Sequence, residues 1–338
     1  ACIVNPAGRD GHSLKRWKAV EPVLKETGIE YEVQFTEGVG HASEIAYSVR
    51  ERDDIDLVVA CGGDGTVHEV ASGLRGSDKP LGIIPAGTGN DVARAHNIPL
   101  KDTKGIVDIL VNGVDRHVGA FRLEAMPAPA EGGYPAPSNN PKWDGDPNNP
   151  DRVVRWVFLE SDCGITSATA RAKLRRAKWI KGSLKYTYLG LTEILPWKKK
   201  KVWFQYDDNP GEEVDYTFMV ASTTEMFGGG YRVCPGASPI LEDGSLCFGW
   251  SLKKLQMIAL MGPLRKGKHV GRWGIELTRA KKISLRATDD DGNPTEKPLT
   301  PPLIIQADGE PCMQIPADLD FHPRQLWVRG AKIVPWDL

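Results

Sequence analysis

Two glycine-rich segments, each directly after a short apolar run, constrain the fold of this chain more than any other feature. CGGDGT at 61–66 follows the apolar residues 57–60, and PAGTGND at 85–91 follows 81–84. Each segment runs into a helix-like stretch. Glycines at such turns let a phosphate chain approach the backbone, and N–H groups at a helix N-terminus attract the anion. Ordinary turn chemistry is the alternative, but two such turns, each with an Asp, favour nucleotide binding.

The first third of the chain alternates strand and helix signals. The pattern predicts a strand at 2–4, a helix at 13–27, a strand at 31–35 and a helix at 41–52, before the two strand–turn–helix units. Such alternation indicates an α/β domain with a parallel sheet, covered by helices on both faces. Ligands of such sheets bind at the carboxyl ends of the strands, which is the edge where both glycine-rich turns lie.

The second half of the chain has a different organisation. Residues 124–151 contain seven prolines and little periodicity, which indicates an exposed insertion or linker. Beyond them, short strand signals separated by turns indicate a β-rich sandwich or barrel-like domain. We therefore predict an α/β nucleotide-binding domain at 1–120, an insertion or linker at 121–152, a β-rich domain at 153–325 and a segment at 326–338 that could add strands to either domain.

The composition is that of a globular protein, with 41% hydrophobic and 26% charged residues. A net charge of −1 gives no global attraction to nucleic acid. The six cysteines are far apart and form no metal-binding or disulfide pattern, so we expect a reducing, cytoplasmic compartment. We recognise no signal peptide and no apolar run near the ~18 residues that span a bilayer. The chain opens inside a strand without Met, from which we expect a trimmed N-terminus.

With both glycine-rich turns in place, the chain resembles the diacylglycerol and sphingosine kinases over nearly its whole length. GGDGT alone is shared with NAD kinases and 6-phosphofructokinases, whereas the second turn and a distant DGEP distinguish the lipid kinases. The segments that carry the resemblance are NPAG at 5–8, TE at 36–37 with HA at 41–42, the two turns, FGGG at 227–230, EDGSL at 242–246 and DGEPCMQIP at 308–316.

The resemblance implies an ATP- and Mg²⁺-dependent phosphoryl transfer to a lipid hydroxyl. It implies an ATP-binding α/β domain and a β-rich lipid-binding domain, with the chemistry between them. The residues expected to bind the nucleotide are Asn5, Thr36, Gly62, Gly63, Gly65, Thr66, Gly87, Thr88, Gly89, Asn90 and Arg94. For Arg94, one helical turn from Asp91, a structural ion pair is an equal alternative.

Three acidic residues are the candidates for catalysis. A carboxylate at Asp64 would repel the phosphates unless a cation lay between them, so we expect it to act through Mg²⁺ or on the acceptor hydroxyl rather than as a turn former. Strand alternation would aim Asp308 and Glu310 to the same side, where they could share a metal or a proton, and a solvated hairpin turn is the equal alternative. The resemblance implies that Asp308 is the general base and that Glu310 orients it or holds Mg²⁺.

Two departures from the family pattern affect the choice of substrate. No acid follows Gly164, where related kinases carry an Asp that receives the amine of sphingosine, unless Asp162 substitutes for it. The resemblance implies a structural Mg²⁺ at Glu242 and Asp243, although 236–239 lacks the acid that the family carries there. We therefore expect diacylglycerol as the substrate. The alternatives are a sphingoid base, ceramide or another lipid alcohol, or a nucleotide-binding regulatory protein that has lost catalysis.

A basic stretch at 171–201 suggests how a lipid would be reached. It holds eleven Lys or Arg and a single acid, with Trp and Tyr interleaved. Basic residues beside aromatic ones suit the headgroup region of an anionic membrane. A solvated loop is the alternative, and nucleic acid is disfavoured. We therefore predict a cytoplasmic, peripherally membrane-associated protein, with no expectation for its oligomeric state.

Overall fold

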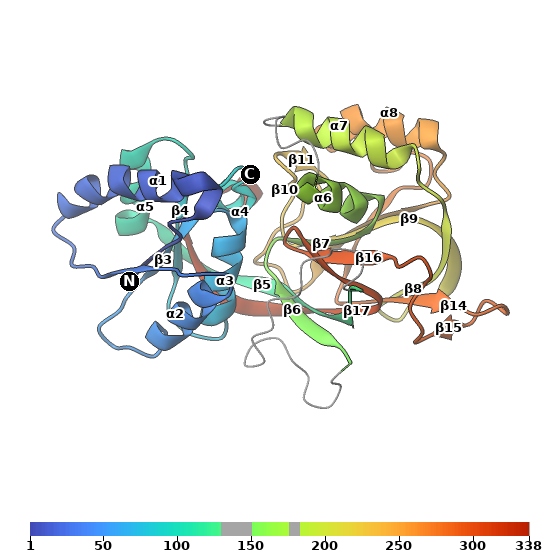
Figure 1. Ribbon diagram of the computed structural model, residues 1–338, viewed down its shortest axis with the longest axis horizontal. Coiled ribbons are helices and arrows are strands. Elements are labelled where there is room, and N and C mark those ends of the chain that lie inside the picture. The colour runs from blue at the N-terminus through green and yellow to red at the C-terminus, as the bar shows by residue number, and fades with distance from the viewer. Residues whose placement is uncertain (130–150, 176–182, 338) are drawn as a thin grey trace. The chain divides into compact units, whose positions relative to one another are not determined.

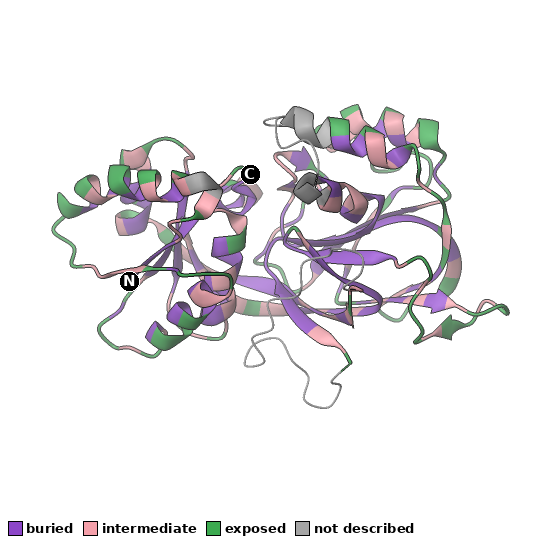
Figure 2. Ribbon diagram, viewed as in Figure 1, coloured by how far each residue is buried: buried purple, intermediate pink, exposed green. Residues whose placement is uncertain are grey.

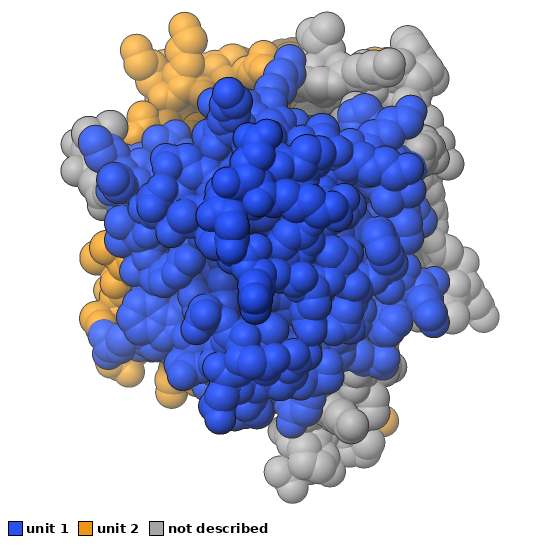
Figure 3. Space-filling model, turned by 90° about the vertical axis from the view of Figure 1, so that its left-hand side faces the viewer, with its two compact units in different colours: residues 1–119, 323–338 blue, residues 120–322 orange. Residues whose placement is uncertain are grey.

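The chain forms two compact units, one of residues Ala1–Gly119 with Pro323–Leu338 and one of Ala120–His322. The computed structural model describes residues 1–129, 151–175 and 183–337 (Figure 1). Most of the predicted insertion therefore lies outside the described residues, although 121–127 are described and continue a strand. Figure 3 shows the surface of the first unit in blue.

The first unit is built on a parallel sheet. Its strands are β1 (Cys2–Val4), β2 (Val33–Phe35), β3 (Val58–Gly62), β4 (Leu81–Pro85) and the end of β17 (Glu310–Gly330). They lie in the order β17-β4-β3-β1-β2, and each neighbouring pair is parallel. Strands β3 and β4 are buried throughout, as the continuous apolar runs require for a sheet covered on both faces.

Helices cover both faces of this sheet (Figure 1). Helices α1 (Gly8–Lys25) and α5 (Thr103–Asn112) pack together on one face, and α2 (His41–Val49) and α3 (Asp64–Leu74) on the other. The short α4 (Asp91–Ala95) follows β4. After β17, the chain ends in a 3₁₀ helix, η2 (Pro335–Asp337).

Several predicted boundaries are wrong by a few residues. Helix α1 begins at Gly8 instead of 13, α2 ends at Val49 instead of 52, and β2 is only three residues long. Helix α3 begins at Asp64, so Asp-Gly-Thr forms its first turn, whereas the sequence analysis placed these residues in the glycine-rich segment before the helix. The helix dipole stabilises an acidic residue in the first turn, and the second glycine-rich turn, whose backbone donates to Asp64, fixes where the helix starts.

The second unit is β-rich, as predicted, and its strands are antiparallel. Strands β14, β8, β9, β7, β16 and β17 pair in that order, and β17 pairs back with β14, which closes them into a barrel-like ring. The strands are β5 (Val114–Pro127), β6 (Val153–Val157), β7 (Glu160–Gly164), β8 (Lys200–Tyr206), β9 (Glu212–Ser222), β10 (Met226–Phe227), β11 (Tyr231–Arg232), β12 (Gly244–Trp250), β13 (Glu276–Ala280), β14 (Lys282–Thr288), β15 (Pro294–Thr295), β16 (Ile304–Ala307) and most of β17.

Residues of the ring and of the neighbouring strands β5 and β12 form the hydrophobic core of the second unit. Phe121, Tyr216, Met219, Leu246 and Ile305 are all fully buried there, and Figure 2 shows the strands as largely buried. Helices α6 (Ile165–Arg175), α7 (Ser183–Ile194) and α8 (Lys254–Arg265) lie outside the strands. Among the described residues, no helix is both long and apolar enough to cross a membrane.

Candidate phosphate-binding site and the acidic residues of the second unit

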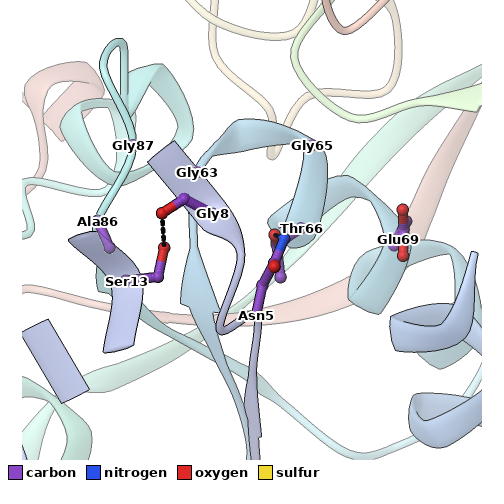
Figure 4. A pocket seen from close by; sticks show the side chains of 9 residues that line it. All are labelled: Asn5, Gly8, Ser13, Gly63, Gly65, Thr66, Glu69, Ala86 and Gly87. Carbon is purple, nitrogen blue, oxygen red and sulfur yellow. Dashed lines mark hydrogen bonds between the residues drawn. The ribbon is translucent and has the colours of Figure 1, made fainter. Parts of the chain in front are cut away.

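The first unit contains a pocket of about 260 Å³ beside the two glycine-rich turns (Figure 4). This volume is just below the ~300–1,000 Å³ usual for small-molecule sites, so it suits a phosphate chain better than a whole nucleotide. Its lining residues are Asn5, Gly8, Ser13, Gly63, Gly65, Thr66, Glu69, Ala86 and Gly87. The pocket therefore includes Asn5, Gly63, Gly65, Thr66 and Gly87 from the predicted nucleotide-binding set.

Hydrogen bonds join the three chain segments around the pocket. Asn5 Nδ2 donates to Thr66 Oγ1 at 3.0 Å, and the backbone N–H of Ala86 donates to the carbonyl of Gly62 at 2.8 Å. Figure 4 shows the Asn5 and Thr66 side chains against each other, and the Ser13 hydroxyl pointing to the Gly8 carbonyl. Gly8, Ser13, Glu69 and Ala86 are lining residues that the sequence prediction missed.

Glycine is required where the two turns cross. A Cβ added to Gly87 would lie 2.5 Å from the Cα of Gly63, and one added to Gly62 would lie 2.5 Å from Thr66 Oγ1. Gly87 thus lets one turn pack directly on the other, and Gly62 leaves room for the Thr66 side chain of its own segment. Gly65 is different, because a Cβ there would meet nothing within 4 Å although the residue lines the pocket.

Asn90 and Arg94, two of the predicted nucleotide contacts, shape the second turn instead of lining the pocket. Asn90 has a left-handed backbone (φ 52°), and its side chain accepts from Gly87 N at 2.7 Å and donates to Gly87 O at 3.1 Å. Arg94 Nε donates to the Gly89 carbonyl at 3.1 Å. The residues of the predicted set outside the pocket lining are Thr36, Gly62, Thr88, Gly89, Asn90 and Arg94.

Asp64 joins the two turns through its carboxylate. One oxygen accepts from Asn90 N at 2.9 Å, and the other accepts from Val92 N at 3.4 Å, at the start of α4. The sequence analysis weighed a local turn-forming role against the catalytic one, and not this role of joining two distant turns. The reasoning missed it because the partners are backbone groups of a different turn, twenty-six and twenty-eight residues away.

In the second unit, Asp308 and Gly309 form a tight hairpin turn between β16 and β17. Both have positive φ, 48° and 89°, and Ala307 pairs with Glu310 across the turn. Asp-Gly is the preferred sequence for such a two-residue hairpin. The hairpin alternative therefore describes the geometry correctly, although the turn is not solvated, since Asp308 is only 9% exposed.

The Asp308 carboxylate holds the segment before and within β7. It accepts the backbone N–H groups of Phe158, Leu159 and Glu160 at 2.9–3.0 Å. The Glu310 side chain is 38% exposed and lies 3.6 Å from the buried guanidinium of Arg155. Strand alternation does not apply to these two acids, because a tight turn and not a strand separates them.

A buried acidic cluster lies beside this turn and was not predicted. Glu160 and Asp162 are 5% and 2% exposed on β7, and Gln306 Nε2 donates to both, at 2.6 and 2.7 Å. Burial, and then the nearby Asp162 carboxylate, raises the pKa of Glu160 well above its usual range. Burial raises the pKa of Asp162 to about 6. The sequence did contain a signal for this cluster, namely two acids at alternate positions of a strand whose other residues are buried.

The predicted metal ligands are not gathered. Across 1–129, 151–175 and 183–337, no group of three or more His, Cys, Asp or Glu side chains is arranged to hold a metal ion. Asp243 instead forms an ion pair with Arg279, and Glu310 lies beside Arg155. Magnesium that accompanies a nucleotide is usually bound by one or two carboxylates and the phosphates, so a dedicated protein cage is not required.

Comparison with known proteins places the chain in a family. Residues 1–123 match the diacylglycerol kinase catalytic domain, and residues 163–330 match the YegS C-terminal NAD kinase beta sandwich-like domain. A diacylglycerol kinase of Mycobacterium tuberculosis is 26% identical over 96% of this chain and 93% of that protein. The chain belongs to the diacylglycerol kinase family of lipid kinases. The family match confirms the resemblance to lipid kinases that the sequence motifs indicated.

Further relatives agree with this family assignment. A diacylglycerol kinase of Bacillus subtilis is 26% identical over 85% of each chain. The solved structure of a diacylglycerol kinase from Bacillus anthracis superimposes with a TM-score of 0.67 at 15% identity, covering 98% of this chain and 97% of that one. At that identity the structural match establishes the fold only.

Proposed function

We propose that this lipid kinase transfers the γ-phosphate of ATP to the hydroxyl of diacylglycerol and forms phosphatidic acid. The observation that supports ATP is the pocket at the crossing of the two glycine-rich turns, next to the N-terminus of α3. Backbone N–H groups and the helix dipole favour phosphate there. The substrate is proposed from the names of the relatives from M. tuberculosis and B. subtilis.

The residues of the pocket fit a phosphate chain and suggest a division of roles. Gly63, Gly65 and Gly87 leave the backbone accessible, and the Thr66 hydroxyl lines the same wall. Asp64 and the ATP phosphates would hold Mg²⁺, which neutralises charge that develops during transfer. In this proposal Asp64 serves both the metal and the packing of the two turns.

For the proton of the lipid hydroxyl we propose Glu310. The resemblance named Asp308, but the carboxylate of Asp308 holds three backbone N–H groups. Glu310 follows the same turn and is the more exposed of the two acids. Asp308 would then fix the turn that places Glu310. A base within hydrogen-bond reach of the acceptor hydroxyl is what the transfer requires.

We also propose that the protein docks on an anionic membrane through the basic stretch, with α7 as the inserted element. Tyr188 and Leu191 of α7, and Leu195 directly after its end, are 46%, 36% and 63% exposed. The tetralysine at 198–201 is a weaker candidate than the sequence suggested, because β8 starts at Lys200. Lys199 and Lys201 lie beside acids on β9, and Lys200 donates to backbone carbonyls.

A transfer assay with radiolabelled ATP tests the function. Diacylglycerol, ceramide, a sphingoid base and monoacylglycerol are each presented in anionic vesicles, with Mg²⁺ or with a chelator. We expect labelled phosphatidic acid from diacylglycerol in the presence of Mg²⁺. Preferred labelling of ceramide or the sphingoid base would replace diacylglycerol as the substrate. Nucleotide binding without transfer to any lipid would favour a protein that has lost catalysis.

A further inference from the structure

The buried Glu160–Asp162 pair has no part in the proposed transfer step, yet it is tied directly to the turn that carries Glu310. Both residues lie on β7, where the two-residue period of a strand places them on the same face. Asp162 is opposite Gln306 in the pairing of β7 with β16. Two carboxylates therefore share a buried space with one amide.

The orientation of Gln306 follows from its neighbours. The backbone N–H of Gly309 can only donate, and it bonds to Oε1 of Gln306. The amide nitrogen must then face the carboxylates, where it donates one hydrogen to Glu160 Oε2 and one to Asp162 Oδ2. The Gln306 side chain thus links the two acids to the second residue of the hairpin turn.

A single proton held between the two acids explains how both can be buried. Two neighbouring carboxylates in an apolar interior repel each other unless one is protonated. Burial and the neighbouring carboxylate raise the pKa of Glu160 well above its usual range, so Glu160 carries the proton and Asp162 accepts it. Besides Gln306, a hydrogen bond from the Thr166 hydroxyl lowers the pKa of Asp162, and both of these donors are neutral groups.

The surroundings do not supply a competing charge, apart from Asp308. Besides Asp308, the titratable groups that interact electrostatically with the pair are Cys163, Tyr216 and Cys234. Burial raises the pKa of each thiol and of the tyrosine, which keeps all three neutral. The negative charge of Asp308 adds to the cost of ionising Glu160.

The backbone of Glu160 completes the link to the turn. Its N–H donates to Asp308 Oδ1 at 3.0 Å, and its carbonyl accepts from Asp308 N at 2.9 Å. Both residues of the turn, Asp308 and Gly309, are thus bonded to Glu160, directly or through Gln306. A shift of the acidic pair would move the turn and the Glu310 side chain that follows it.

We propose that Glu160, Asp162 and Gln306 are positioning residues that hold one shared proton and fix the Asp308–Gly309 turn for phosphoryl transfer. The part of this proposal that concerns transfer rests on the role proposed for Glu310. The shared proton and the fixed turn do not depend on it, so they are tested separately.

Infrared spectroscopy tests the shared proton without any measurement of activity. At pH 7, where exposed carboxyl groups are ionised, the wild-type protein should show the C=O band of a buried protonated carboxyl group. Glu160→Gln should lack this band, and the matched exposed control Glu212→Gln should keep it. A wild-type spectrum without the band, or a band that persists in Glu160→Gln, would overturn the shared proton whatever the substrate of the enzyme is.

Kinetics with a water-soluble short-chain lipid test the positioning role. Glu160→Ala should lower kcat by about 10²-fold, the effect of a misplacement of roughly 1 Å, and leave the KM for ATP unchanged. Glu160→Gln should restore most of the lost kcat, because a neutral amide can donate to Asp162 as the protonated acid does. Full kcat in a folded Glu160→Ala protein, or a Glu160→Gln protein as impaired as Glu160→Ala, would overturn the role. A wild-type protein inactive on every lipid would instead refute the proposed function.

Discussion

At the scale of single residues, the side chains chosen as catalytic also hold the backbone. Asp64 accepts N–H groups from the second glycine-rich turn, and Asp308 accepts three from residues 158–160. The sequence indicated that both positions need a carboxylate. It did not indicate why, because the backbone donors are far away in the chain and become neighbours only after folding.

The Asp64→Asn variant measures how these two roles are divided. In the wild type, backbone N–H groups donate to the Asp64 carboxylate. In the variant, the amide nitrogen of Asn would face one of these donors and leave it without an acceptor. This should lower the free energy of unfolding by about 1–3 kcal/mol. We expect that loss together with a fall in kcat of ~10³-fold or more, since an interaction with developing charge is removed. Urea unfolding and the transfer assay measure the two effects. Near-normal turnover in the folded variant would contradict a role for Asp64 in transfer.

Paired variants separate Glu310 from Asp308. Glu310→Gln should lower kcat strongly and leave unfolding by urea almost unchanged, because the carboxylate is partly exposed and next to one arginine. Asp308→Asn should lower both, because at least one of the three backbone bonds is lost. If Glu310→Gln kept full turnover and a stable Asp308→Asn did not, Asp308 would be the base, as the resemblance implied.

At the scale of elements, the succession of strands and helices followed from periodicity, and the helix starts did not. The apolar runs at 57–60 and 81–84 do form the buried strands β3 and β4. The start of α3 at Asp64 depends on where the next turn packs, and no local pattern encodes that. The long strand β17 was not predicted either, because it continues through three prolines and several charged residues.

The crossing of the two turns gives a prediction at this scale. Gly87→Ala should destabilise the protein by about 1–3 kcal/mol, since its Cβ would overlap the backbone of Gly63. The control is Gly262→Ala in α8, where the added Cβ has open space, and alanine should stabilise the helix by up to ~1 kcal/mol. Urea unfolding of both variants decides the matter. Equal stability would mean that the two turns are not packed as described.

Vesicle binding tests the membrane role of α7. Replacing Tyr188, Leu191 and Leu195 together by Ser should weaken sedimentation with anionic vesicles and leave turnover of a soluble short-chain lipid unchanged. Val39→Ser, an exposed apolar residue of the first unit, is the control and should sediment like the wild type. Sedimentation unchanged by the triple substitution would place the membrane contact elsewhere.

At the scale of the whole molecule, the sequence indicated an α/β part and a β-rich part, and the family match agrees with both. The buried acidic pair could not be predicted from the sequence, because the pairing of β7 with β16 brings Glu160, Asp162 and Gln306 together. Its effect extends to the stability of the entire chain, since ionisable groups with shifted pKa values make unfolding depend on pH.

The sign of that dependence follows from the raised pKa of Asp162. A carboxyl group whose folded pKa lies above the unfolded one contributes stability at low pH that is lost as pH rises through the folded value, here about 6. Relative to the wild type, Asp162→Asn should therefore gain unfolding free energy as pH rises from 4 to 7. Urea unfolding across that range measures the difference, and a constant difference would contradict an ionised Asp162.

Binding of ATP to Gly65→Ala tests the central claim most directly. Gly65 lines the pocket in the first turn of α3 and an added Cβ has open space, so alanine should fit the helix while its methyl group occupies the phosphate site. Calorimetric titration should give a Kd for ATP at least about tenfold weaker than that of the wild type, equivalent to ~1.4 kcal/mol, with stability unchanged or increased. An unchanged Kd in the stable variant would show that the phosphates of ATP do not bind in this pocket.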